Sequence, residues 1–188
     1  MLNNFRNSIQ PILKQLGKAF SIIGIHPNVW TYVSFIFAII AGIMYAKHES
    51  YSLFLSSIFV LFSGFFDIVD GQVARFSKLI SKKGEFMDSV LDRISESAIY
   101  FGILIGNYTD NYIVVLALVS SFLVSYLRSK SESMQIKIQG IGIGERAERL
   151  VIIIILGIAG FIEIALIVII FISIITIFQR MYSVLRHI

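Results

Sequence analysis

The sequence predicts an all-α integral membrane protein with six transmembrane helices and an N-terminal amphipathic helix in the membrane interface. Of the 188 residues, 56% are hydrophobic, which leaves too little polar surface for a soluble domain of this length. Several apolar runs approach the ~20 residues that a bilayer-spanning helix needs. We expect one membrane domain over residues 1–188, with the interfacial helix in 1–25 and a six-helix bundle in 29–184.

The first twenty residues place apolar side chains at helical spacing between basic ones, as in a helix that lies in the membrane interface. An ordinary amphipathic helix packed on the protein fits the same pattern. Pro11 is expected to interrupt this helix or to start its second half. The segment lacks the apolar core of a signal peptide, and the absence of cysteine excludes disulfides.

The six spans follow from apolar runs separated by short polar turns. Asn28 is the expected N-cap of the first span. The first four spans are predicted at 29–46, 51–75, 84–106 and 112–127, the last continuing as a helix to about residue 132. The apolar run from 150 to 178 is too long for one span, so a turn is expected near Gly157, Gly160 and Glu163.

The basic residues support an even number of spans. With six spans, both termini, the second-to-third loop and the fourth-to-fifth loop share one side of the membrane. Of the 16 Lys and Arg residues, only Lys47 falls on the other side. Because positive charge marks the cytoplasmic face, we expect a multi-pass cell-membrane protein with both termini in the cytoplasm.

Four aspartates flank the second-to-third loop, on the same predicted cytoplasmic side. Asp67 and Asp70 are i,i+3 neighbours, and Asp88 and Asp92 are i,i+4 neighbours, so each pair lies on one helical face. Two helices joined by a short loop can point all four carboxylates into one volume. Carboxylates at that density repel unless cations lie between them, and hard oxygen ligands favour Mg²⁺ or Mn²⁺. A single acid at the interface, by contrast, is often only solvated.

Two cations held by four carboxylates form a clamp for phosphoryl chemistry. The cations would neutralise a diphosphate, and Asp92 is the candidate for taking a proton from an incoming hydroxyl. The small residues Gly71 and Ala74 allow a ligand to approach the backbone closely, and Arg75 is placed to pair with a phosphate.

The pattern Asp-x-x-Asp-Gly-x-x-Ala-Arg, eight residues, Gly-x-x-x-Asp-x-x-x-Asp over residues 67–92 resembles the motif of the CDP-alcohol phosphotransferases at every fixed position. The resemblance implies six transmembrane helices, usually in a homodimer, and transfer of a phosphate-linked group from a CDP-alcohol to a hydroxyl with release of CMP. It implies two divalent cations, Mg²⁺ or Mn²⁺, on Asp67, Asp70, Asp88 and Asp92, with Asp92 also the base. The contacts it implies with the CDP-alcohol are Asn28, Val29, Trp30, Thr31, Asp67, Gly71, Ala74, Arg75 and Ser81.

The acceptor is indicated by the connector between the fourth and fifth spans. Residues 125–132 and 144–149 resemble the matching segments of phosphatidylinositol-phosphate and archaetidylinositol-phosphate synthases, which use inositol 1-phosphate. The first segment has Arg128 where those enzymes often have Lys. A phosphorylated acceptor needs a cationic pocket. The expected phosphate-binding residues are Ser125, Arg128, Arg146 and Arg180. The alternative interpretation of each arginine is positive-inside anchoring or pairing with lipid headgroups.

Other functions remain open at this point. The donor is expected to be a CDP-lipid, either CDP-archaeol or CDP-diacylglycerol, and no nucleic-acid partner is expected. A sister transferase would use glycerol 3-phosphate or serine as acceptor, or CDP-inositol as donor in di-inositol-phosphate synthesis. A cation transporter is the alternative from another class, but it predicts acids near the bilayer midplane, whereas these cluster towards one face.

Overall fold

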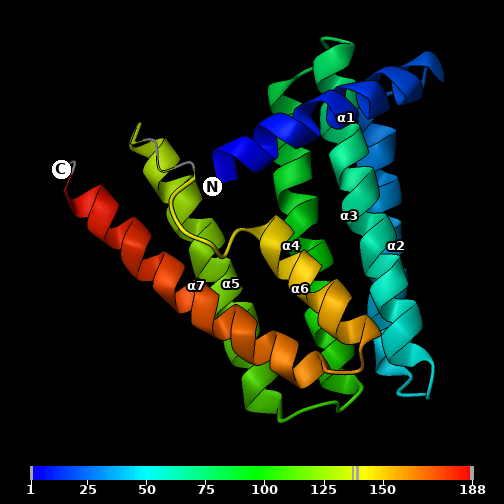
Figure 1. The fold of residues 1–188 in the computed structure, drawn as a ribbon, viewed down its shortest axis with the longest axis vertical. Helices are drawn as coiled ribbons and strands as arrows, with labels where there is room; N and C mark the ends of the chain where they lie inside the picture. Colours follow the sequence, from blue (N-terminus) through cyan, green and yellow to red (C-terminus); the bar gives the residue numbers. More distant parts are fainter. Residues whose placement is uncertain (1, 137, 139, 187–188) are drawn as a thin grey trace.

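The computed structural model describes residues 2–136, 138 and 140–186, with side chains described from residue 10 onward. Within that part of the chain it contains seven helices and no strand (Figure 1). Their bounds are α1 Leu2–Ile22, α2 Pro27–Ala46, α3 Ser52–Phe76, α4 Lys82–Ile105, α5 Asn111–Ser133, α6 Arg146–Ile158 and α7 Ile162–Leu185.

Helix α1 lies across one end of the bundle and packs on α3 (Figure 1). It runs unbroken through Pro11, so the expectation that this proline interrupts the helix was wrong. Pro11 is exposed, where a helix tolerates the loss of one backbone hydrogen bond because water reaches the freed carbonyl. Gly17 contacts α3 so closely that a Cβ on it would lie 3.0 Å from Gln72 Cβ.

The start of α2 lies two residues before the predicted one. Asn28 is not the N-cap, because the helix already begins at Pro27. The cap is His26, whose Nδ1 accepts a hydrogen bond from the backbone N–H of Asn28 at 3.2 Å. Proline suits the first helical position, since its φ is already helical and its missing N–H would have had no partner there.

Helix α2 is the scaffold for both aspartate-bearing helices, because it packs on α3 and on α4. Its crossing with α4 is very close: a Cβ on Gly42 would collide with the carbonyl of Ala98, and one on Gly102 with the backbone of Gly42. The glycines therefore fix the distance between the two helix axes, and with it the place of α4 relative to α3.

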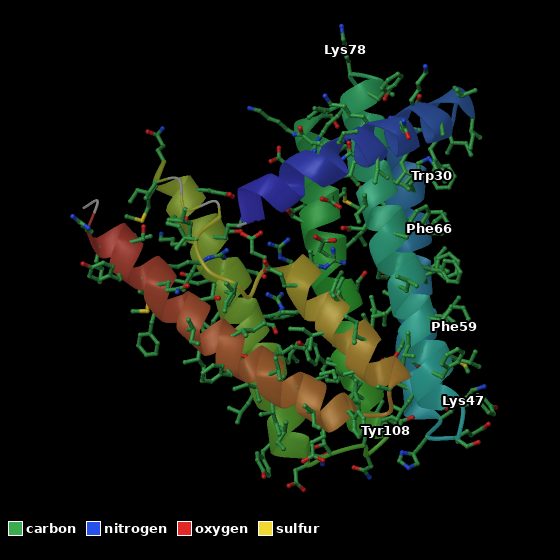
Figure 2. The ribbon with its side chains drawn as sticks, in the orientation of Figure 1. Trp30, Lys47, Phe59, Phe66, Lys78 and Tyr108 are labelled. Carbon is green, nitrogen blue, oxygen red and sulfur yellow. The ribbon has the colours of Figure 1, made fainter. Side chains whose placement is uncertain are left out.

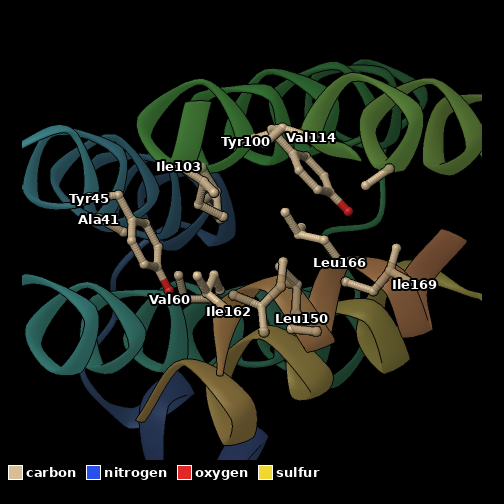
Figure 3. Packing of buried hydrophobic residues seen from close by; sticks show 14 of the residues in the cluster. Ala41, Tyr45, Val60, Tyr100, Ile103, Val114, Leu150, Ile162, Leu166 and Ile169 are labelled. Atoms are coloured by element: carbon tan, nitrogen blue, oxygen red, sulfur yellow. The ribbon is translucent and has the colours of Figure 1, made fainter. Parts of the chain in front are cut away.

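The hydrophobic core lies between α2, α3 and α4 on one side and the pair of α6 and α7 on the other (Figure 3). Tyr45 and Val60 contribute from α2 and α3, and Leu150 and Leu166 from α6 and α7, all almost fully buried. Helix α7 also packs along α5. The core thus joins the two halves of the chain, so that the start of α6 is held near the aspartates.

The long apolar run divides where the sequence predicted. Helix α6 ends at Ile158 and α7 begins at Ile162, with Gly160 in the left-handed region at a φ of 83°. Helix α6 begins at Arg146 rather than at residue 150, because Glu145 and Glu148 form a capping box that extends the helix by a turn.

Four of the described helices, α2, α3, α5 and α7, are long and apolar enough to cross a membrane by length and composition. Helix α4 is not among them and carries Asp88, Asp92 and Glu96. Helix α6 is not among them either: its 13 residues extend over ~20 Å, whereas the hydrocarbon core of a bilayer is ~30 Å thick. The count of six spans therefore stays a prediction. Lys78 and Lys47 lie at opposite ends of the bundle, as the predicted topology requires (Figure 2).

Candidate active site

The aspartates come together near the turn that joins α3 to α4. Asp67 and Asp70 lie towards the end of α3, and Asp88 and Asp92 in the first half of α4. The turn stays short because Ser81 caps α4, its hydroxyl accepting a hydrogen bond from the backbone N–H of Gly84 at 3.0 Å. The antiparallel chain reversal therefore returns the second pair of aspartates to the level of the first.

Three of these carboxylates converge on one point. Asp67, Asp70 and Asp88 each offer an oxygen, and these oxygens lie within 4.8 Å of one another. Asp70 is only 6% exposed. Its Oδ2 and Asp88 Oδ1 are buried and have no hydrogen-bond partner among the described residues. Buried, unpaired like charges are costly, so the oxygen donors fit a hard divalent cation such as Mg²⁺ or Mn²⁺.

Asp92 has a different environment, because it shares a guanidinium with Asp67. Arg146, the first residue of α6, places its Nη1 2.9 Å from Asp67 Oδ1 and 2.6 Å from Asp92 Oδ1. The Arg146 side chain is 16% exposed, so water screens both contacts only weakly. The start of α6 is thus tied to α3 and α4 through two carboxylates.

A cavity of about 260 Å³ opens on one side of the aspartates. Asp70 and Asp88 form one wall. A Cβ on Gly71 would meet no atom within 4 Å, so this side of α3 is open to a ligand. We call it the nucleotide-side cavity; the predicted contact residues that line it are Asn28, Thr31, Gly71, Ala74, Arg75 and Ser81.

The other predicted contacts, Val29, Trp30 and Asp67, are not among the described residues that line this cavity. Trp30 packs instead in an aromatic cluster, with its ring stacked on Phe66 at a centroid distance of 5.7 Å and Phe20 edge-on at 5.1 Å (Figure 2). Val29 is 44% exposed. The motif that begins at Asn28 therefore contains two cavity-lining residues, Asn28 and Thr31, while Trp30 packs on neighbouring helices and Val29 is exposed.

A second, polar cavity of about 480 Å³ lies on the other side of the aspartates. It shares Arg75, Glu85 and Asp88 with the nucleotide-side cavity, and Asp92 lines it as well. We call it the arginine cavity; all four predicted acceptor residues line it, namely Ser125, Arg128, Arg146 and Arg180. Figure 2 shows side-chain nitrogen and oxygen atoms between α4, α5 and α6.

The arginines differ in how firmly they are held. Arg180 is 1% exposed and donates to the carbonyls of Ile141 and Val124, at 3.0 and 2.8 Å, and to Glu145 at 3.0 Å. Arg180 therefore holds the connector between α5 and α6 in place. Arg128 pairs with Glu132 at 3.1 Å, and its side chain is 37% exposed, so it has room to turn towards a ligand.

The sequence interpretation assigned no role to Glu96, which is the third acid at four-residue spacing on α4 after Asp88 and Asp92. It is 1% exposed and accepts two hydrogen bonds from Arg149, both at 2.8 Å. The i,i+4,i+8 spacing is the signal that would have placed it on the aspartate face. Finding its partner required the tertiary structure.

A third cavity, of about 410 Å³, runs from the site towards the outside between α3 and α6. Asp67, Asp92 and Arg146 lie at its polar end. The rest of its lining is mainly apolar, with Leu61, Ile68, Leu150, Val151 and Ile154. We call it the apolar groove; it connects the aspartates to a face of the molecule on which Leu61, Ile68 and Val151 are each about half exposed.

The helical fold and the aspartate site together match a family of membrane enzymes. The chain belongs to the CDP-alcohol phosphatidyltransferase family, whose model matches residues 24–179. It is therefore a transferase of phospholipid biosynthesis, and the family expectation drawn from residues 67–92 is confirmed. Its apolar helices and its family together indicate a membrane protein.

Particular relatives are similar over nearly the whole chain. The archaetidylinositol phosphate synthase of Pyrococcus horikoshii is 33% identical over 97% of this chain and 96% of its own length. That of Methanothermobacter thermautotrophicus is 36% identical over 98% and 94%. The phosphatidylinositol phosphate synthase of Mycobacterium tuberculosis, solved with CDP-DAG bound, has the same fold, with a TM-score of 0.78 at 23% identity over 93% of this chain and 94% of that one. The same enzyme was solved with manganese and citrate, with a TM-score of 0.78 at 24% identity over 92% and 88%.

Proposed function

We propose that the chain transfers a phosphatidyl or archaetidyl group from a CDP-lipid to a hydroxyl of myo-inositol 1-phosphate and releases CMP. The observation that carries the proposal is the arginine cavity, which adjoins the nucleotide-side cavity across Asp88. A cavity with several guanidinium groups suits an acceptor that bears a phosphate. The two archaeal relatives, both named archaetidylinositol phosphate synthase, support this choice of acceptor.

The donor fits the other two cavities. The CDP moiety would bind in the nucleotide-side cavity, with its phosphates near Arg75 and against the open face of Gly71. The hydrocarbon chains would leave the site through the apolar groove, which ends at a face suited to the bilayer. This division puts the diphosphate next to Asp67, Asp70 and Asp88, where the three carboxylates converge.

Asp67, Asp70, Asp88 and Asp92 would hold two divalent cations. Mg²⁺ or Mn²⁺ bound there would neutralise the diphosphate and stabilise the charge that develops on the CMP phosphate as it leaves. The unpartnered oxygens of Asp70 and Asp88 support such a site. The manganese complex of the mycobacterial relative supports the same class of ion.

Asp92 lines the arginine cavity, so it faces the acceptor rather than the nucleotide. In the proposed reaction it takes the proton of the attacking hydroxyl. The acceptor oxygen then forms a bond to the phosphorus that carries the lipid, and the bond from that phosphorus to the oxygen of CMP breaks. Ser125, Arg128, Arg146 and Arg180 would position the acceptor phosphate, with Arg180 acting mainly by holding the connector.

We also propose that the chain crosses the bilayer six times, that α1 lies in its interface, and that the site and both termini are cytoplasmic. The crossing of α1 over one end of the bundle supports this arrangement (Figure 1). The loop after α3 carries Lys78 and belongs to the same end, while Lys47 lies at the far end (Figure 2). A homodimer remains a prediction from the family.

The test is CMP release by purified protein with Mg²⁺ or Mn²⁺ and a CDP-lipid, adding one acceptor at a time. Release that depends on myo-inositol 1-phosphate is expected, and ester- and ether-linked donors tested side by side identify the lipid. Release with glycerol 3-phosphate or serine instead would overturn the acceptor. Release of CMP from CDP-inositol instead of from a CDP-lipid would overturn the assignment of a lipid donor. Cation transport into vesicles without CMP release from any pair would overturn the enzyme assignment itself.

A further inference from the structure

Arg146 bridges two of the four carboxylates that would hold the proposed cations. Its Nη1 lies 2.9 Å from Asp67 Oδ1 and 2.6 Å from Asp92 Oδ1. Asp67 at the same time belongs to the group of three convergent carboxylates. Since a carboxylate oxygen that accepts from a guanidinium offers less electron density to a cation, the two interactions compete.

The other buried arginines are not in this position. Arg149 donates to both oxygens of Glu96 and to the carbonyl of Gly144, at 2.8, 2.8 and 2.5 Å. The partners of Arg180 are two carbonyls and Glu145, none of which belongs to the aspartate group. Both guanidinium groups would keep their partners when a cation binds.

Arg146, in contrast, is held mainly by the aspartates. The hydrogen bonds and ion pairs described for it go to Asp67 and Asp92, and its buried Nε has no hydrogen-bond partner in the described part of the chain. It also lines the arginine cavity, where Ser125 and Arg128 lie. Its guanidinium can therefore turn further into the arginine cavity when divalent cations bind the aspartates.

We propose that Arg146 is a switch that couples cation binding to acceptor binding. Without divalent cations, Arg146 holds Asp67 and Asp92 together and is unavailable to an anion. When cations occupy the aspartates, Arg146 releases them and turns its guanidinium into the arginine cavity, where it binds the acceptor phosphate. The acceptor half of this inference rests on the proposed function, whereas the cation half does not.

The switch has a thermodynamic consequence. If cations free Arg146 for the anion, then cation binding must raise the affinity for phosphate, and phosphate must raise the affinity for the cation by the same factor. Removing Arg146 should greatly weaken this coupling and, because a competitor is lost, should strengthen cation binding in the absence of any substrate.

The cation half is tested by titrating the purified protein with Mn²⁺ alone and measuring free Mn²⁺ by electron paramagnetic resonance. Arg146→Gln is expected to bind Mn²⁺ about tenfold more tightly than the unsubstituted protein, within the usual range for coupled sites. Arg128→Gln is the matched control, because it removes a charge from the same cavity without touching Asp67 or Asp92. Arg146→Gln binding no more tightly than Arg128→Gln would overturn the switch, since general charge repulsion would then account for the change.

The acceptor half is tested by calorimetric titration with inorganic phosphate, with and without saturating Mg²⁺. Mg²⁺ is expected to strengthen phosphate binding to the unsubstituted protein and to have a much smaller effect on Arg146→Gln. Equal strengthening in both proteins would overturn the coupling. Arg146→Lys serves as a second variant if Arg146→Gln does not fold, and is expected to bind Mn²⁺ with intermediate affinity. A wrong acceptor in the proposed function leaves the Mn²⁺ result unchanged, so the two failures are distinguishable.

Discussion

Glu96 and Arg149 form a bidentate ion pair inside the helical bundle. Arg149 Nε lies 2.8 Å from Glu96 Oε1, and Arg149 Nη2 lies 2.8 Å from Glu96 Oε2. Both side chains are at most 1% exposed. The pair joins α4 to α6 one turn beyond Asp92 on α4 and one turn beyond Arg146 on α6. It therefore fixes the spacing between the catalytic base proposed here and the arginine that contacts it.

Glu96→Gln should destabilise the fold, because it leaves the positive charge of Arg149 buried without the negative charge of the Glu96 carboxylate beside it. Breaking a buried pair in this way typically costs about 3–5 kcal/mol. The measurement is the thermal unfolding midpoint in detergent. The double variant Glu96→Leu with Arg149→Met should recover most of the lost stability, since an apolar pair of similar volume removes the unpaired charge. A single variant as stable as the unsubstituted protein would show that the pair contributes nothing.

Asp92→Asn should leave the protein folded and reduce turnover by about 10²–10⁴-fold, the usual contribution of a general base. The amide keeps the shape of the side chain but does not take the proton of the acceptor hydroxyl. The measurement is the rate of CMP release at saturating donor and acceptor. Size-exclusion elution and the unfolding midpoint serve as controls for the fold. Near-normal turnover would assign the base to another residue.

Gly71→Leu and Gly42→Leu should fail in different ways. A side chain on Gly71 extends into the nucleotide-side cavity, where a Cβ meets no atom within 4 Å, so stability should stay normal while KM for the CDP-lipid rises at least tenfold. A side chain on Gly42 collides with the Ala98 carbonyl and should lower the unfolding midpoint by several degrees. The unfolding midpoint and the KM for the CDP-lipid, measured for both variants, distinguish a binding defect from a packing defect. A stable Gly42→Leu variant would contradict the close helix crossing.

Removal of divalent cations should abolish CMP release, and Mg²⁺ or Mn²⁺ should restore it after the chelator has been dialysed away. Asp70→Asn should prevent the restoration, since Asp70 is the most buried of the convergent carboxylates and loses half of its ligand oxygens. The measurement is CMP release against added cation for both proteins. Glu85→Gln, which neutralises an exposed acid that lines both cavities but does not belong to the convergent carboxylates, is the control. Its activity should be restored at the same cation concentration as that of the unsubstituted protein. Activity that survives exhaustive chelation would remove the cations from the proposed mechanism.

The local features of the site were readable from the chain. The i,i+3 and i,i+4 spacing of the aspartates defined their helical faces, because that property follows from helix geometry over a few residues. Gly71, Ala74 and Arg75, which the sequence singled out, line the nucleotide-side cavity. The division of the long apolar run followed from its length, and Gly157, Gly160 and Glu163 indicated where the turn lies. Helix ends were less certain: His26 replaced Asn28 as cap, and the capping box of Glu145 moved the start of α6 to Arg146.

The sequence by itself therefore determined the helical membrane class, the family and the four aspartates, since these depend on composition, periodicity and a motif within one short stretch. Only the tertiary structure decided which arginine meets which acid. Arg146 and Arg149 are separated from Asp92 and Glu96 by more than fifty residues, and nothing local distinguishes them. Their pairing depends on how α6 is packed against α3 and α7 by the buried core, and a long-range contact of that kind leaves no periodic trace in the chain.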